Sequence, residues 1–202
     1  MAIRGRPRSF DRKAALERAM ELFWERGYRG TSLTDITTAL GINRPSLYAA
    51  FGNKEALFRE AVALYSDNLR GPVESALRGE LTARAAIAKT LYTYAEAFSR
   101  PGTPLGCLVV LSATDGPDND DPLRELLTEL RGSLQAGILL RLQFAVREKE
   151  IPDTVNIAAL ADYFGTVVYG MAIQARDGAP YDALIATADL AITVMETIET
   201  RQ

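Results

Sequence analysis

Apolar residues recur along most of the chain at the three- and four-residue spacing of an amphipathic α-helix. In the segment 11–26, Leu16, Ala19, Met20 and Phe23 fall on one face of such a helix. Breaks rich in Gly, Pro, Asp and Asn separate the periodic segments, and no strand-like alternation of apolar and polar residues competes. The pattern predicts an all-α fold of about nine helices, over 11–26, 33–40, 44–51, 54–70, 81–99, 104–114, 122–149, 155–176 and 181–200.

Two of the predicted helices are short, follow a longer one, and are joined by the tripeptide 41–43. Gly41 suits the left-handed backbone that ends a helix, and Asn43 is a favourable N-cap. Pro45 falls in the first turn of the next helix, where a missing N–H costs little. These features predict a three-helix head that contains a helix-turn-helix. The expected caps of the first two helices are Ser9 and either Thr31 or Ser32.

Composition narrows the possible functions. The chain has 202 residues, 48% of them apolar, which is enough for a sizeable core in one or two domains. Histidine and Gly-rich phosphate loops are absent, which argues against an enzyme, although carboxylates, lysine or tyrosine remain as catalytic groups. A single cysteine excludes an internal disulfide framework and multi-cysteine zinc sites, so we expect no metal and no cofactor. No apolar run approaches the about 20 residues that span a bilayer, so we expect a cytoplasmic protein without a membrane partner.

Charge is distributed unevenly along the chain. Residues 1–60 hold eleven Lys and Arg against seven Asp and Glu, a net charge of +4, whereas the whole chain carries −3. The remainder therefore carries −7. A basic head on an acidic body is expected when only the head meets a polyanion.

Polar side chains on the helix-turn-helix are of the types that contact DNA. Hydroxyl, amide and guanidinium groups bind phosphates and base edges. We expect Arg44 and Ser46 to meet base edges, and Tyr48 and Lys54 to bind phosphate; Tyr48 is alternatively a half-buried core aromatic. An arginine-rich arm precedes the head and suits the minor groove, unless it is a solvated tail. The candidate DNA-binding residues are Arg4, Arg6, Arg8, Thr31, Ser32, Thr34, Asn43, Arg44, Pro45, Ser46, Tyr48 and Lys54.

Residues 10–58 resemble the DNA-binding head of tetracycline-repressor-type (TetR family) transcriptional regulators. The resemblance rests on "GRPRSFD", "LFWERGYRGTSLTDIT" and "LGINRPSLYAAFGNKEAL". It implies a homodimer that places two third helices in successive major grooves of near-palindromic double-stranded DNA. It also implies a helical body for dimerisation and effector binding, and we divide the chain into an arm and head (1–53) and a body (54–202). Ala49 and Ala50 depart from the family pattern, in which an aromatic residue and a histidine are frequent.

The last two predicted helices are apolar on more than one face, so one stripe is free for a second partner. The family resemblance implies that these helices pair across a two-fold axis into a four-helix bundle. The alternative is an ordinary buried helix in a monomer. The expected interface residues are Phe164, Val168, Met171, Ile192 and Met195.

An apolar effector pocket is expected among the helices of 81–149. Its candidate lining residues are Tyr92, Phe98, Cys107, Leu108, Leu111, Leu130 and Leu134. Cys107 falls in the first turn of a predicted helix, where unpaired N–H groups favour a thiolate, so an electrophile or oxidant sensor is one reading. Its apolar neighbours favour the other reading, a small buried hydrophobe.

The sequence thus predicts a DNA-binding transcriptional regulator, a repressor released from its operator by a small apolar effector. A thiol sensor built on Cys107 is an alternative. A protein that bends DNA through an AT-hook-like arm is a more distant one, because it leaves the helix-turn-helix unexplained.

Overall fold

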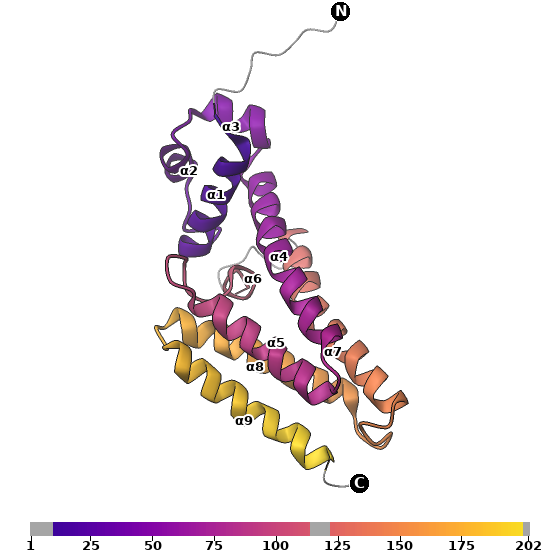
Figure 1. Cartoon of the computed structure of the whole chain (residues 1–202). Coiled ribbons are helices and arrows are strands. Elements are labelled where there is room, and N and C mark those ends of the chain that lie inside the picture. Colours follow the sequence, from indigo (N-terminus) through magenta and orange to yellow (C-terminus); the bar gives the residue numbers. More distant parts are fainter. Residues whose placement is uncertain (1–9, 114–121, 200–202) are drawn as a thin grey trace, which may run out of the picture.

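The computed structural model describes residues 10–113 and 122–199, and these residues form helices without any strand. A small head stands at one end of the molecule and a larger helical body at the other (Figure 1). The head helices are α1 (Arg12–Arg26), α2 (Leu33–Leu40) and α3 (Arg44–Phe51). The remaining helices are α4 (Lys54–Gly79), α5 (Ala83–Ser99), α6 (Leu108–Leu111), α7 (Pro122–Arg147), α8 (Ile157–Arg176) and α9 (Tyr181–Glu199).

The head helices begin and end close to where the sequence placed them, because local caps define them. The N-cap of α1 is Asp11, whose carboxylate accepts from the backbone N–H groups of Lys13 and Ala14. The predicted cap, Ser9, lies outside the described residues. Ser32, the second of the two candidates, caps α2.

Aromatic side chains fill the core of the head. The ring of Phe23 on α1 lies 5.1 Å from that of Phe58 on α4, and Tyr28 lies 4.9 Å from Phe58. Ile36 of α2 and Leu47 of α3 are buried beside them. The first half of α4 therefore belongs to the packing of the head, although our predicted domain boundary between residues 53 and 54 stays a prediction.

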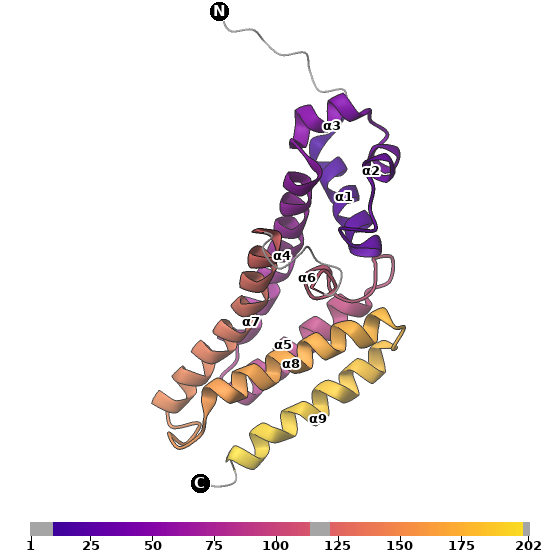
Figure 2. The same ribbon diagram turned by 180° about the vertical axis from the view of Figure 1, so that it is seen from behind.

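The body is built on α5, α8 and α9. Helices α8 and α9 lie side by side along its lower face, with α5 packed against both (Figures 1 and 2). Buried apolar residues such as Phe164 and Met171 of α8 and Leu184 of α9 form this core. Helix α8 alone among the described helices is long and apolar enough to span a bilayer, but it packs between α5, α7 and α9 as a core helix.

Two elements of the body differ from the sequence-based expectation. Helix α4 does not end near Arg70 but continues through Pro72 to Gly79, since its apolar stripe still packs on α7 beyond the proline. Helix α6 spans four residues in place of the predicted 104–114, because Gly102 and Gly106 hold positive φ angles of 82° and 81° that interrupt a helix.

The segment before α6 and the end of α8 hold head and body together. A Cβ atom at Gly106 would lie 2.6 Å from the Ala172 carbonyl oxygen, so the loop fits directly against α8. Near it, the guanidinium of Arg176 donates to the Glu25 carbonyl at the end of α1. The head therefore contacts the body through α8 as well as through α4.

Candidate nucleic-acid interface and ligand cavity

A tight turn sets the angle between α2 and α3. Gly41 has φ 63° and ψ 30°, and its N–H donates to the carbonyls of Thr37 and Thr38 at the end of α2. The side-chain oxygen of Asn43 then accepts from the backbone N–H of Ser46 at 2.9 Å, which starts α3. The turn therefore has the backbone that the sequence predicts for it.

The start of α3 presents its side chains to solvent. Arg44, Pro45 and Tyr48 are exposed, and Ser46 is half-buried. The guanidinium of Arg44 donates to the Thr34 hydroxyl at 3.1 Å, which brings the two helices' candidate residues together. Tyr48 is 46% exposed and is not part of the hydrophobic core, which favours the phosphate-binding prediction over the half-buried core alternative.

Lys54 lies at the first position of α4, next to the head. Its ammonium stands 4.3 Å above the ring of Tyr28, a cation–π geometry. Burial lowers the pKa of Lys54, while the nearby Asp35 carboxylate acts in the opposite direction. The ammonium is thus held in place at the edge of the candidate DNA-binding face.

The structure corrects the prediction that Thr31 contacts DNA. It is fully buried, and its hydroxyl donates to the Gly27 carbonyl at 2.7 Å, so it cannot meet DNA. Ser32 is exposed, but its hydroxyl lies 2.5 Å from an Asp35 carboxylate oxygen in a reciprocal cap. Arg4, Arg6 and Arg8 lie outside the described residues.

Arg12 was missed by the sequence analysis. Both Glu60 carboxylate oxygens accept from its guanidinium at 2.7 Å, and its Nε donates to the Ala50 carbonyl at 3.2 Å. The guanidinium also covers the ring of Phe51 at 4.5 Å. Arg12 thereby fastens the end of α3 to α1 and α4, a position that no short motif signals.

A cavity of about 750 Å³ lies between α4, α5, α7 and α8. This volume is in the range that holds drug-sized ligands. Phe98, Cys107, Leu130 and Leu134 line the cavity as predicted. Its remaining apolar wall comes chiefly from Leu69, Val73 and Leu77 of α4, with Tyr94 of α5 and Val168 of α8. The α4 wall was not predicted, because the pocket was expected among the helices of 81–149 and α4 was expected to end near Arg70.

Three other predicted pocket residues lie elsewhere. The Tyr92 hydroxyl donates to Asp189 of α9 at 2.6 Å, on the outer side of α5. Leu108 is 1% exposed and belongs to the continuous core. Leu111 is half-buried against that core and does not line the cavity.

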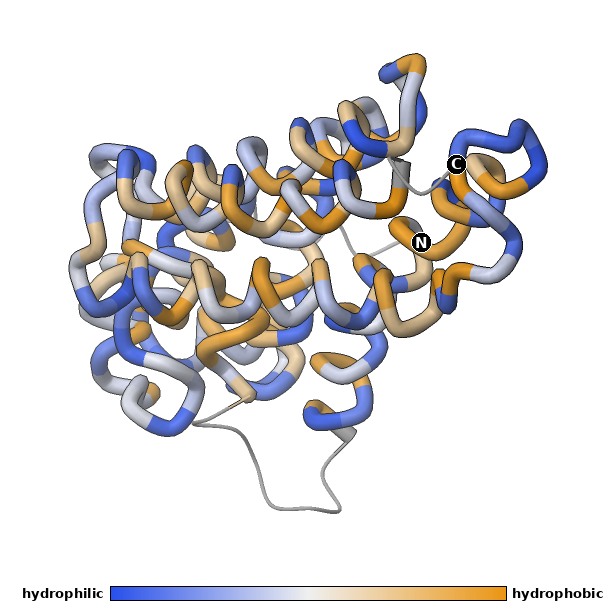
Figure 3. Tube along the Cα trace, turned by 90° about the horizontal axis from the view of Figure 1, so that it is seen from below, coloured by the Kyte–Doolittle hydropathy of each residue, from blue (hydrophilic) through white to orange (hydrophobic). Residues whose placement is uncertain are grey.

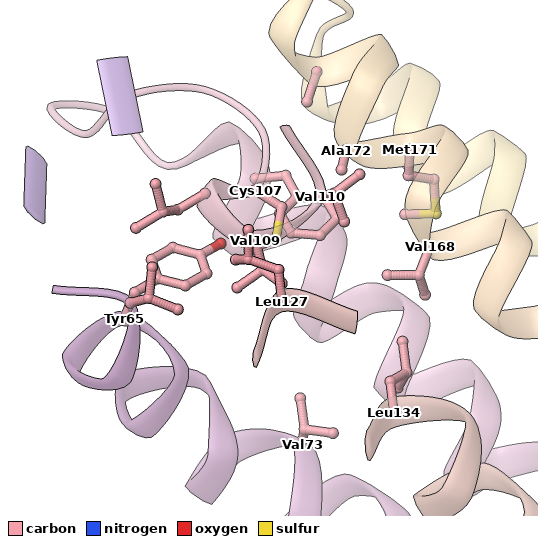
Figure 4. Packing of buried hydrophobic residues seen from close by; sticks show 14 of the residues in the cluster. Tyr65, Val73, Cys107, Val109, Val110, Leu127, Leu134, Val168, Met171 and Ala172 are labelled. Carbon is pink, nitrogen blue, oxygen red and sulfur yellow. The ribbon is translucent and has the colours of Figure 1, made fainter. Parts of the chain in front are cut away.

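Cys107 is the N-cap residue of α6 and is buried. The Tyr65 hydroxyl points toward its sulfur (Figure 4), although Tyr65 makes no well-formed hydrogen bond within the described chain. Burial raises the pKa of the Cys107 thiol, and it raises the pKa of Tyr65 as well. Burial thus favours the neutral form of both groups.

The five predicted dimer-interface residues, Phe164, Val168, Met171, Ile192 and Met195, are all buried within the protomer. That part of the prediction needs correction, because these side chains already pack on their own chain. The large apolar residues that stay exposed on the same helices are Tyr163 and Ile173 of α8 and Tyr181 and Leu190 of α9. Viewed from the α9 side, apolar and polar segments alternate along the helices (Figure 3).

Within residues 10–113 and 122–199, no group of three or more Cys, Asp or Glu side chains is arranged to hold a metal ion.

Two family models match the chain. The model described as "Bacterial regulatory proteins, tetR family" matches residues 15–61, and "Tetracyclin repressor-like, C-terminal domain" matches residues 81–188. Among curated proteins, the HTH-type transcriptional repressor ComR of Escherichia coli (strain K12) is 37% identical over 190 residues, covering 92% of this chain and 89% of ComR. The repressor BdcR of the same strain is 29% identical over 197 residues, covering 97% of this chain and 94% of BdcR.

A solved structure of a TetR family regulator is also similar to this chain. A cysteine-substituted form of the TetR family transcriptional regulator CifR, complexed with 26-bp double-strand operator DNA, superposes with a TM-score of 0.89. The two sequences are 38% identical, and the match covers 94% of this chain and 98% of that one.

Proposed function

Because the chain belongs to the tetR family of bacterial regulatory proteins and is a DNA-binding transcriptional regulator, we propose that it is a homodimeric repressor released by a small molecule. The two similar E. coli proteins are repressors. We further propose that it acts in the cytoplasm and has no enzymatic activity.

One observation supports the DNA-binding role most strongly. The exposed start of α3 carries Arg44 and Tyr48 on a helix whose angle is fixed by the Gly41 turn and by the Arg12 clamp. Each third helix would then enter a major groove, with Arg44 at a base edge and with Tyr48 and Lys54 at phosphates. In the similar CifR complex the bound ligand is operator DNA.

A second protomer would pack on the exposed apolar residues of α8 and α9, which include Ile173 and Leu190. Two heads joined in this way read half-sites about 34–36 Å apart, or a multiple of that distance. Joining the heads raises the effective concentration of the second head at its half-site.

The effector would occupy the cavity bordered by α4, α5, α7 and α8. Its wall includes Val73 and Leu77 of α4, the same helix that carries Phe58 into the head core. A ligand that shifts this wall therefore displaces a helix that continues directly into the head.

DNase footprinting of the DNA around the protein's own gene tests the proposal. A repressor of this type protects one short near-palindrome. Protection spread over A/T-rich DNA would instead favour the architectural alternative.

Sedimentation of Leu190→Asp, with exposed Leu140→Asp of α7 as the matched control, tests the dimer. The first variant is expected to be a monomer with weakened footprinting, and the control an intact dimer.

A thiol sensor is the second candidate, and the neighbouring Tyr65 hydroxyl is the observation in its favour (Figure 4). A sensing thiol has to be ionised and accessible. Cys107 is 5% exposed and its pKa is raised, so release by a non-covalent ligand is the function we favour.

A further inference from the structure

The wall of the cavity is positively charged. Five arginines line it, at positions 70, 78, 131, 141 and 147, against two glutamates at 74 and 80. A carboxylate oxygen of Glu80 already forms an ion pair with the Lys89 ammonium, at a distance of 2.6 Å. The wall therefore has an excess of positive charge, which favours the binding of an anion.

Among these arginines, Arg131 is half-buried and interacts electrostatically with Cys107 and Tyr169, which also line the cavity. Its Nη2 donates to the Thr128 hydroxyl at 3.0 Å, while its Nη1 is buried and makes no hydrogen bond to any described residue. The Nη1 of Arg141 is likewise buried without a partner among the described residues, but Arg141 lies 3.3 Å from a carboxylate oxygen of Glu150, and Arg70 lies 3.0 Å from one of Asp67. Arg131 differs from both in that the hydrogen bond of its guanidinium goes to a neutral hydroxyl. An unpaired buried guanidinium N–H costs free energy, which a ligand acceptor would recover.

Three tyrosines line the cavity, and one of them, Tyr169, already donates to the Arg131 carbonyl at 2.7 Å. The other two, Tyr65 and Tyr94, interact with Cys107, which also interacts with Arg131. The Tyr65 hydroxyl is buried without a hydrogen-bond partner within residues 10–113 and 122–199. Tyr94 also lines the cavity, and burial raises its pKa, so its hydroxyl remains a donor. Three donors with unused hydrogen-bonding capacity thus lie around one apolar space, and a carboxylate accepts up to about four hydrogen bonds.

The rest of the wall is hydrocarbon. Leu69, Val73 and Leu77 of α4, Leu130 and Leu134 of α7, and Phe98 of α5 all line the cavity. Such a surface binds an alkyl or aryl group and offers it no polar contact.

We propose that the effector is an amphipathic carboxylic acid whose carboxylate binds Arg131 and the Tyr65 and Tyr94 hydroxyls, while its hydrocarbon part lies between α4 and α7. This inference rests on the proposed function, because it names the chemistry of the molecule that enters the effector cavity. Charge-assisted hydrogen bonds to the guanidinium provide the selectivity for the acid over neutral molecules of equal size.

Calorimetric titration of the whole protein with sodium decanoate, methyl decanoate and 4-phenylbutyrate tests the proposal. We expect an acid to bind more tightly than the ester, and Arg131→Met to weaken acid binding by about 10- to 100-fold. Arg131→Lys keeps the charge and is expected to retain most of the affinity. The control is Arg100→Met, at an exposed arginine that does not line the cavity, for which we expect little change.

Tyr65→Phe removes one donor without changing the charge, and it is expected to weaken acid binding by roughly 2- to 10-fold. This second variant keeps the test decisive if Arg131→Met does not fold. Equal binding of ester and acid, an unchanged affinity in Arg131→Met and Tyr65→Phe, or no binding of either acid would overturn the proposal.

Operator release is measured separately, by fluorescence anisotropy of the footprinted duplex. Binding of decanoate through Arg131 without release would support the ligand chemistry and contradict the proposed release mechanism. Failure to bind any DNA would contradict the proposed function and leave the titration result standing.

Discussion

The head and the cavity use their polar groups in opposite ways. In the head, hydroxyl and carboxylate groups are committed to neighbours, as in the cap of Ser32 with Asp35 and the clamp of Arg12 on Glu60. In the cavity wall, Tyr65 and the Nη1 of Arg131 are buried without hydrogen-bond partners among the described residues. These bonds hold the head in one shape, although the buried Nε1 of Trp24 on α1 also lacks a partner among the described residues. The cavity wall, by comparison, keeps hydrogen-bonding capacity in groups that face the space for a ligand.

The largest expected effect comes from breaking the aromatic core of the head. Phe58→Ala removes a fully buried ring that contacts Phe23 and Tyr28, and should lower the free energy of unfolding by about 3–5 kcal/mol. Chemical denaturation measures the loss. The matched variant is Phe98→Ala, also fully buried but lining the cavity, and it should cost less. An equal loss in both variants would show that the cavity wall is as tightly packed as the head.

A smaller effect is expected from removing a side chain of the head that has no structural role. Arg44→Ala should weaken operator binding by about 1–3 kcal/mol per half-site and relax the preference at one base step. Stability should not change, because Arg44 is exposed and bonds only the Thr34 hydroxyl among the described residues. Competition with altered operators measures the change, and Arg78→Ala in the body is the control of equal charge. Equal losses on operator and random DNA would place Arg44 on a phosphate.

The cap of α2 is expected to have a moderate effect on stability. Ser32→Ala removes the hydroxyl that accepts from the Asp35 N–H at 3.1 Å, and should cost about 0.5–2 kcal/mol. Thermal unfolding checks this value against Thr38→Ala, an exposed threonine of the same helix. A loss as large in Thr38→Ala would mean that helix propensity, and not the cap, accounts for the change.

The same cap makes the head sensitive to acid. Hydrogen bonds from the Ser32 side chain and backbone hold the pKa of Asp35 below its ordinary 3.8. The stabilisation is therefore complete above pH 3.8 and is lost as the pH falls through the lower pKa of the folded state. NMR titration of the Asp35 carboxyl should show its pKa rising toward 3.8 in Ser32→Ala, and an unchanged pKa would contradict this account.

No effect at all is expected from thiol reagents on the native protein. Cys107 is buried with a raised pKa, so a maleimide should react only after denaturation. Mass spectrometry at intervals measures the reaction. Rapid labelling of the native protein with loss of DNA binding, absent in Cys107→Ser, would establish the thiol sensor.

The same contrast explains what the sequence could predict. The ends of α2 and α3 are fixed by residues within a few positions of them, namely Ser32, Gly41, Asn43 and Gly52, and these signals are readable in the chain. The extent of α4 beyond Pro72 depends on packing against α7, which is far away in the sequence. The cavity wall and the buried state of Val168 depend on such distant contacts too, so helical spacing alone did not predict them.

Pro72 has a consequence for how the molecule opens. A proline lacks the N–H that would pair with the Asn68 carbonyl, so it interrupts the hydrogen-bond ladder of α4. The start of the helix before the proline packs on α1 through Leu57 and Phe58, whereas the part after it lines the cavity with Val73 and Leu77 and does not reach the head. Amide hydrogen exchange should therefore divide the chain into cooperative units at this proline, within a continuous helix. The head's unit of local unfolding would then extend some five turns beyond α3.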